Sequence, residues 1–147
     1  MKDIISSSNF DAKKEAMPVY PEKLIDHYKN PRNLGEMEKP NAIGEVRNNK
    51  YGDLIYFYLR IEKNDGKEVI RDIRFQTFGC AISIATSSVL TELIKGKSLN
   101  EAQRISEKDI AEALQIPINP MDHGINLAIN GLRDAIKNYY DNKYKSS

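Results

Sequence analysis

The stretch FQTFGCAISIATSS, residues 75–88, decides how this chain folds. Its first residues are typical of the end of a β-strand, Gly79 permits a tight turn, and the residues from Cys80 onward have helical spacing. Cys80 is the only cysteine of the chain and stands at the expected N-terminus of that helix. The unpaired N–H groups and the positive dipole end there favour a thiolate. By position alone, Cys80 is either a reactive or metal-binding thiol or a small buried side chain.

The residues before this stretch predict a β-hairpin. Apolar and polar residues alternate over 55–62, and residues 64–66 read Asn-Asp-Gly, which is a strong signal for a tight turn. A turn centred near Asp65 pairs residues whose numbers sum to about 131, which places Asp53 opposite Phe78. Asp53 and Cys80 are therefore expected at the same end of the sheet. Residues 43–48 are expected to add a short edge strand.

Helical patterns flank the hairpin on both sides. The first helix ends at the Asn-Pro-Arg-Asn run at 30–33, because the residue before a proline is disfavoured in a helix. The last helix begins at His123, and its charged tail from Asp141 is expected to fray. This order predicts an α+β fold, a small three-stranded antiparallel sheet with helices packed on one face. The expected helices cover 21–29, 80–95, 99–104, 107–115 and 123–140.

Length, charge and cysteine content narrow the class of protein. The 147 residues suit a single domain over 19–147, preceded by a flexible arm at 1–18. A formal net charge of +1 gives no support for a nucleic-acid or membrane surface as partner. A single cysteine excludes an internal disulfide, and no stretch has the pattern of a membrane span or signal peptide. We expect a soluble, cytoplasmic protein.

Three residues of different types are candidates for one metal site. The carboxylate of Asp53, the thiolate of Cys80 and the imidazole of His123 are all ligands for zinc or iron. Three protein ligands with one open position suit a reactive metal site. The residues also permit a structural interpretation, in which Asp53 caps a turn and His123 caps a helix. His27, the other histidine, lies within the first helix and is interpreted as structural or surface.

Several motifs together resemble the iron–sulfur cluster assembly scaffold family, IscU and the N-terminal domain of NifU. The opening helix with its Asn-Pro-Arg-Asn run at 30–33 is similar to that family's signature. The segment around Gly79 and Cys80 is similar to its central Gly-Cys motif, and residues 95–102 resemble the segment after it. The resemblance covers residues 19 to 143 and implies the family's fold.

The family's cluster site is where the sequence departs from this pattern, because two of the three family cysteines are missing. The family's Cys-Gly-Asp motif here reads Tyr51-Gly52-Asp53, and its His-Cys motif reads His123-Gly124. The second match needs one extra residue in the preceding loop; without it, His123 would take the place of the cysteine and Asp122 that of the histidine. The chaperone-binding Leu-Pro-Pro-Val-Lys segment is replaced by residues 116–120.

The resemblance implies a scaffold, not an enzyme, that binds iron, an Fe–S cluster or a single zinc or iron ion through Asp53, Cys80 and His123. Tyr51 could add a phenolate, or a second subunit or a partner protein could complete the ligand shell. The implied partner is a cysteine desulfurase, whereas the altered segment counts against a DnaK-type chaperone. The oligomeric state stays open.

Two other functions remain open at this point. The chain could be a non-catalytic paralogue that keeps the fold in order to bind and regulate the assembly machinery. It could also be a cysteine enzyme, with His123 as the base and Asp53 orienting it, although no hydrolase signature surrounds these residues.

Overall fold

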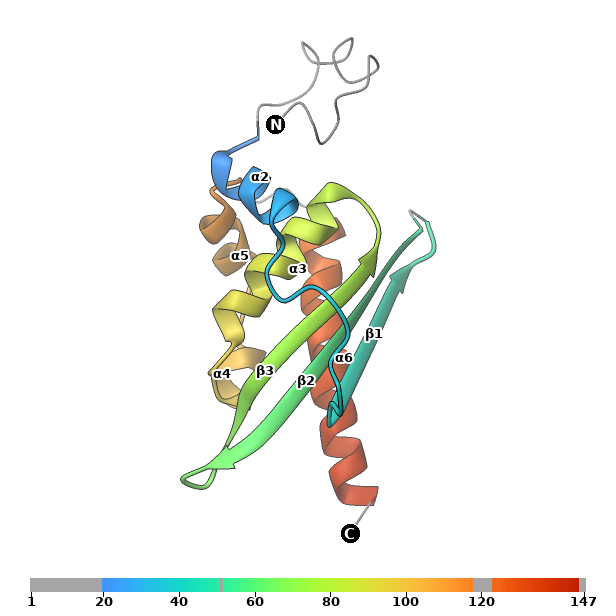
Figure 1. Cartoon of the computed structure of the whole chain (residues 1–147), viewed down its shortest axis with the longest axis vertical. Coiled ribbons are helices and arrows are strands. Elements are labelled where there is room, and N and C mark those ends of the chain that lie inside the picture. Colours follow the sequence, from blue (N-terminus) through green and yellow to red (C-terminus); the bar gives the residue numbers. More distant parts are fainter. Residues whose placement is uncertain (1–19, 51, 118–122, 146–147) are drawn as a thin grey trace.

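The protein is a small antiparallel sheet with its helices on one side, as Figure 1 shows for this computed structural model. The structure describes residues 20–50, 52–117 and 123–145, so the expected arm at 1–18 lies outside the described residues. The predicted α+β fold is confirmed. None of the helices within the described ranges is long and apolar enough to cross a membrane. In chain order the elements are α2 (Glu22–Lys29), β1 (Ala42–Asn48), β2 (Asp53–Asn64), β3 (Lys67–Phe78), α3 (Ala81–Ile94), α4 (Leu99–Gln103), α5 (Glu107–Leu114) and α6 (His123–Lys145).

The β2–β3 hairpin is the longest pairing in the sheet, and it contains one irregularity. Asp65 and Gly66 both have positive φ, as a type I′ hairpin turn requires. From Asn64↔Lys67 to Ile61↔Ile70 the paired numbers sum to about 131 as expected. A β-bulge between Arg60 and Ile61 then shifts the register by one residue. Phe78 consequently pairs with Leu54, so Asp53 is carried one position further, to the level of Gly79.

The core lies between the inner face of the sheet and the helices. The alternation predicted for β2 is confirmed, since its inward-facing residues are all buried. The apolar stripe of α6 packs against this face and is buried as well. The largest buried members of these two rows are Ile55, Phe57, Leu59, Ile61, Ile125, Ile129, Leu132 and Ile136.

Helix α3 occupies the middle of the helical layer and is buried on most sides. It packs against α2, α5, α6 and β3. Its buried surface is therefore wider than the single apolar stripe that the sequence pattern indicated. Five further buried positions are small hydroxyl residues, and all of them except Ser87 have a hydrogen-bond partner for the side chain among the described residues. They are Ser83, Thr86, Ser87, Ser88 and Thr91.

Helix α6 lies very close to β1 and bonds to its outer edge. A side chain at Gly44 would collide with the backbone of Gly131 and Ala135, so glycine is required for this approach. The backbone N–H of Glu45 donates to Asp134 Oδ2 (2.9 Å), and Asn138 Nδ2 donates to the carbonyl of Ile43 (2.8 Å). These two side chains of α6 thus satisfy backbone groups of β1 that face away from β2.

The tail of α6 corrects one expectation. The helix does not end near Asp141 but continues to Lys145. Lys137 Nζ donates to Asp141 Oδ2 at 3.1 Å, one turn further along the same face. Such a pair between residues four apart adds a small stabilisation to the helix at Asp141.

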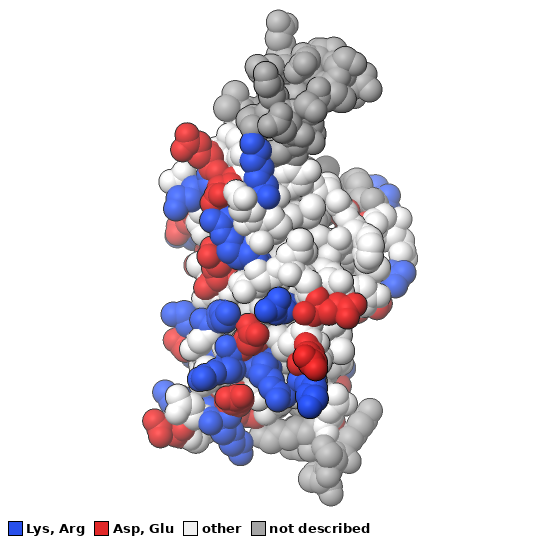
Figure 2. Space-filling model, in the orientation of Figure 1, with Lys and Arg blue, Asp and Glu red and all other residues white. Residues whose placement is uncertain are grey.

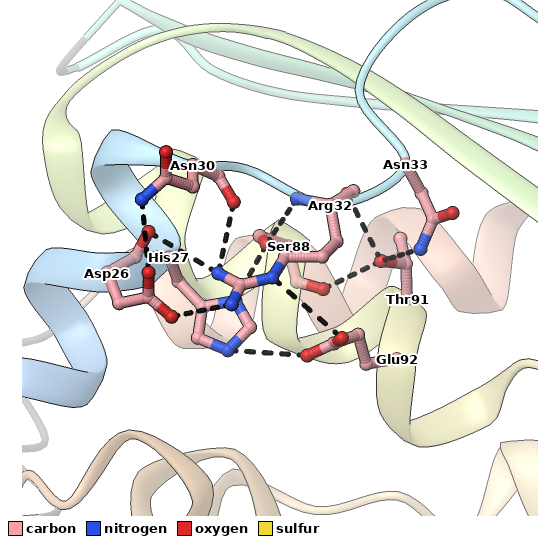
Figure 3. Close-up of polar contacts among 8 residues, drawn as sticks. All are labelled: Asp26, His27, Asn30, Arg32, Asn33, Ser88, Thr91 and Glu92. Atoms are coloured by element: carbon pink, nitrogen blue, oxygen red, sulfur yellow. Dashed lines mark hydrogen bonds and ion pairs between the residues drawn. The ribbon is translucent and has the colours of Figure 1, made fainter.

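A polar network joins α2 and the turn after it to α3 (Figure 3). His27, on α2, is buried, and its Nδ1 lies 2.7 Å from Ser88 Oγ. The same hydroxyl accepts a hydrogen bond from the backbone N–H of Arg32 (2.9 Å). Asn33 Nδ2 donates to Thr91 Oγ1 at 2.9 Å. The Asn-Pro-Arg-Asn run is therefore held against the hydroxyl residues of α3, and His27 has a structural role.

The partners of His27 favour its neutral form. The Ser88 hydroxyl accepts a hydrogen bond from the backbone N–H of Arg32 and can donate its own hydrogen to Nδ1 of His27. The neutral imidazole then has its hydrogen on Nε2, which lies 3.4 Å from Glu92 Oε1. Burial lowers the pKa of His27 below its ordinary 6.5, and the positive charge of Arg32 lowers it further, while Glu92 and Asp26 oppose the shift. The folded protein thus binds a proton at His27 less readily than the unfolded chain does.

We expect the free energy of unfolding to fall as the pH is lowered through about 6.5, because the unfolded chain then takes up a proton that the folded state resists. Chemical denaturation at pH 7.5 and 5.5 measures this loss. His27→Gln should reduce the difference between the two pH values. Equal differences in the parent and in His27→Gln would contradict the assignment.

Candidate functional site

The turn from β3 into α3 presents the single thiol. Cys80 is the N-cap residue of α3, with extended backbone angles (φ −81°, ψ 172°), and it is exposed. Its side chain makes no capping hydrogen bond to the helix backbone. The sulfur lies 3.6 Å from the hydroxyl of Ser83 in the first turn. The predicted position of Cys80 at a helix N-terminus is thus found in the structure.

Asp53 lies against this turn, at the first position of β2. The residue is buried, with 4% of its surface exposed. A Cβ built on Gly79 would lie 2.6 Å from Asp53 Oδ1, so the carboxylate occupies the space that a side chain at position 79 would need. Because Gly79 directly precedes Cys80, the structure brings the carboxylate and the thiol to the same end of the sheet.

His123 is the first residue of α6, and its side chain lies outside the described part of the structure, as does Tyr51. The backbone beside it lies against α3, where Thr86 Oγ1 is 3.3 Å from the carbonyl oxygen of Gly124 and shares its single hydrogen between this carbonyl and the nearer carbonyl of Ile82 (2.8 Å). Thr86 is six residues after Cys80, about 9 Å along the helix. The backbone at the start of α6 therefore approaches the first turns of α3.

The described side chains do not by themselves form a complete metal site. Within residues 20–50, 52–117 and 123–145, no group of three His, Cys, Asp or Glu side chains is placed to hold a metal ion. Asp53 and Cys80 are two of the three predicted ligands and lie at one end of the sheet. The participation of His123 stays a prediction.

An apolar surface adjoins the thiol. Phe78, two residues before Cys80, is 65% exposed, and Leu34 on the neighbouring segment is 48% exposed. A groove of about 690 Å³ lies beside them, lined by Tyr28, Lys29, Asn30, Pro31, Leu34, Thr77 and Ile84. Figure 2 shows an area without charged side chains in the centre of the upper part of the face drawn, with acidic and basic residues along its left side and in a belt below it.

Two residues of the site were not singled out from the sequence. Gly79 was interpreted as a turn residue, but it also makes room for the Asp53 carboxylate. Ser83 was counted as one residue of a helix, although it contacts the thiol. The spacing of three between an N-cap residue and the third helical residue was the signal available for Ser83.

Comparison with known proteins gives a consistent result. Residues 19–146 match the family described as NifU-like N terminal domain. The chain is 46% identical to iron-sulfur cluster assembly scaffold protein IscU 1 of Archaeoglobus fulgidus, over 83% of this chain and 77% of that protein. It is 44% identical to the IscU scaffold protein of Escherichia coli, over 82% of this chain and 94% of that protein.

A solved structure agrees with these relatives. The crystal structure described as a putative iron-sulfur cluster assembly scaffold protein for the SUF system, from Fervidobacterium islandicum, superimposes with a TM-score of 0.63 at 25% identity. The match covers 80% of this chain and 96% of that one. The chain therefore belongs to the NifU-like N-terminal domain family, as its motifs indicated.

Proposed function

We propose that this protein is an atypical iron–sulfur cluster assembly scaffold that binds iron, a cluster or a single zinc or iron ion through Asp53, Cys80 and His123. The observation that carries the proposal is the Asp53 carboxylate, buried in the space left by Gly79 and beside the thiol-bearing turn. The relatives named as scaffold proteins support the functional class. Binding is proposed, and catalysis is not.

The donor set suits some cargoes better than others. A [2Fe–2S] cluster takes four protein ligands, usually thiolates, whereas this chain has one cysteine. A thiolate, a carboxylate and an imidazole fit a tetrahedral zinc or iron ion whose fourth ligand is water. A whole cluster would need a further ligand from a second subunit or a partner protein. The proposed sulfur source is a cysteine desulfurase.

Metal and sulfide analysis tests this proposal directly. We expect protein purified without oxygen to contain iron or zinc, and Cys80→Ser to lose more than about tenfold in metal affinity, because a primary ligand is removed. Acid-labile sulfide together with a visible spectrum distinguishes a cluster from a single ion. Equal metal content in the parent and in Cys80→Ser would show that the metal lies elsewhere.

A second substitution tests the place of Asp53. Gly79 does not have a positive φ, so alanine suits its backbone, but the added Cβ would displace the carboxylate. We expect Gly79→Ala to weaken metal binding about tenfold while the thermal unfolding transition is retained. In an Asp53→Ala background the same change should have no further effect. Equal losses in both backgrounds would contradict a role through Asp53.

The alternative function is that of an adaptor, a paralogue without cargo that binds and regulates the assembly machinery. The exposed Phe78 and Leu34 beside the groove favour it, because exposed apolar surface of this kind is typical of protein-binding sites. Absence of metal from both the parent and Cys80→Ser would favour this alternative over the scaffold.

We expect Phe78→Ser to weaken binding to a purified cysteine desulfurase about tenfold, because an aromatic contact is lost. Isothermal titration calorimetry measures the change. Ile43→Ser is the matched control, because Ile43 is also an exposed apolar residue of the sheet, at 45%. Ile43 pairs with Tyr58 of β2, whereas Phe78 pairs with Leu54. Tyr58 and Leu54 are four residues apart on the same strand, which is about 13 Å. Equal losses in both variants would argue against docking at the thiol end.

A further inference from the structure

Ser83 is the residue around which a further inference is built, and it is fully buried in the first turn of α3. Within the described residues, the hydrogen bond recorded for its hydroxyl is the 3.6 Å contact with Cys80 Sγ. A serine in a helix can instead donate to the backbone carbonyl three or four residues earlier, as Thr86 does here toward Ile82 and Ser83. The hydroxyl of Ser83 is directed to the thiol.

The arrangement follows from a spacing that recurs in this chain. At α4 and α5 the N-cap serine and the third helical residue form reciprocal capping boxes, Ser98 with Glu101 and Ser106 with Asp109. At α3 the same two positions carry Cys80 and Ser83. A carboxylate in the third position accepts from the backbone of the cap residue, whereas a hydroxyl can donate to the cap side chain.

The charge state of the sulfur determines which atom donates. In a neutral thiol either atom of the pair can be the donor. A thiolate or a metal-bound sulfur has no hydrogen, so the hydroxyl of Ser83 must donate. Since Ser83 is buried and Cys80 is exposed, the hydroxyl approaches the sulfur from the protein side, and the outward side stays open to a ligand.

We propose that Ser83 is a positioning residue, which donates a hydrogen bond to the Cys80 sulfur and thereby orients and tunes it as a ligand. This inference rests on the proposed function, in which Cys80 binds the cargo. Hydrogen bonds to a metal-bound sulfur stabilise its lone pairs and alter its electronic coupling to the metal. Removing the donor should therefore change the spectrum of a bound metal even when the fold is intact.

The chain offers a matched control for this test. Ser87 lies one turn further along α3 and is also fully buried, and its Oγ has no hydrogen-bond partner among the described residues. Ser83→Ala and Ser87→Ala remove the same atom from the same helix, and alanine suits a helix at both positions. They differ in whether the lost hydroxyl contacts the sulfur.

The experiment is anaerobic titration of the full chain and both variants with Co²⁺, which reports sulfur ligation through a thiolate-to-cobalt charge-transfer band. We expect the band of Ser83→Ala to move to longer wavelength, because the sulfur electrons are held less tightly, and the band of Ser87→Ala to match the parent. Circular dichroism melts confirm that each variant is folded.

The remaining outcomes separate the two proposals. If the parent shows the charge-transfer band and the Ser83→Ala variant shows it at the same wavelength, the role of Ser83 is overturned, whereas the proposed metal site is supported. Equal shifts in both alanine variants would overturn it as well, since they would show a general effect of helix packing. A parent that takes up Co²⁺ without a charge-transfer band, or none at all, would overturn the proposed site and this inference with it.

Discussion

The pairing of β2 with β3 is the constraint on which the rest of the structure depends. The hairpin turn at Asp65 and Gly66 aligns two long strands, and the bulge between Arg60 and Ile61 shifts the pairing of their far ends by one residue. Asp53 is thereby brought level with Gly79, where the absence of a side chain leaves room for its carboxylate. Since α3 begins directly after this point, the register of two strands also decides what lies beside the thiol.

Helix α3 transmits this placement to the rest of the molecule. A helix packed on most sides cannot shift without disturbing α2, α5, α6 and β3 together. Its buried hydroxyl groups replace apolar contacts with directional ones, of which the pair of His27 and Ser88 is the clearest. Leaving one of these polar groups without its partner costs about 1–3 kcal/mol, so the network discriminates against other packings of α2. The thiol therefore projects from a rigid support.

Much of this fold follows from local patterns, and the remainder depends on contacts between distant residues. Alternation in β2, the Asn-Asp-Gly turn and the two capping boxes are local signals, and each predicted element is present. The bulge opposite Arg60 and Ile61 interrupts the alternation in β3, where Ile70 and Ile73 are both buried although they are three residues apart. A turn-centred register does not include this extra residue, so it placed Asp53 one position away from Gly79. The buried serines of α3 look polar in sequence, and only their neighbours explain their burial. Among the site residues, Asp53 and Cys80 were placed by topology, whereas Ser83 required the contact itself.

The side chains that α6 extends to β1 limit how this protein can assemble. Asp134 and Asn138 already bond to Glu45 and Ile43, and on the opposite border of the sheet the backbone of Phe75 bonds to Asn33 and Gly35. A foreign strand seeking to extend the sheet would meet occupied groups at these points on both borders. These occupied groups oppose the addition of a strand from another molecule, and therefore oppose polymerisation through the sheet. Among the described residues, side-chain surfaces are then better suited to association than these strand borders, and such surfaces can be selected residue by residue.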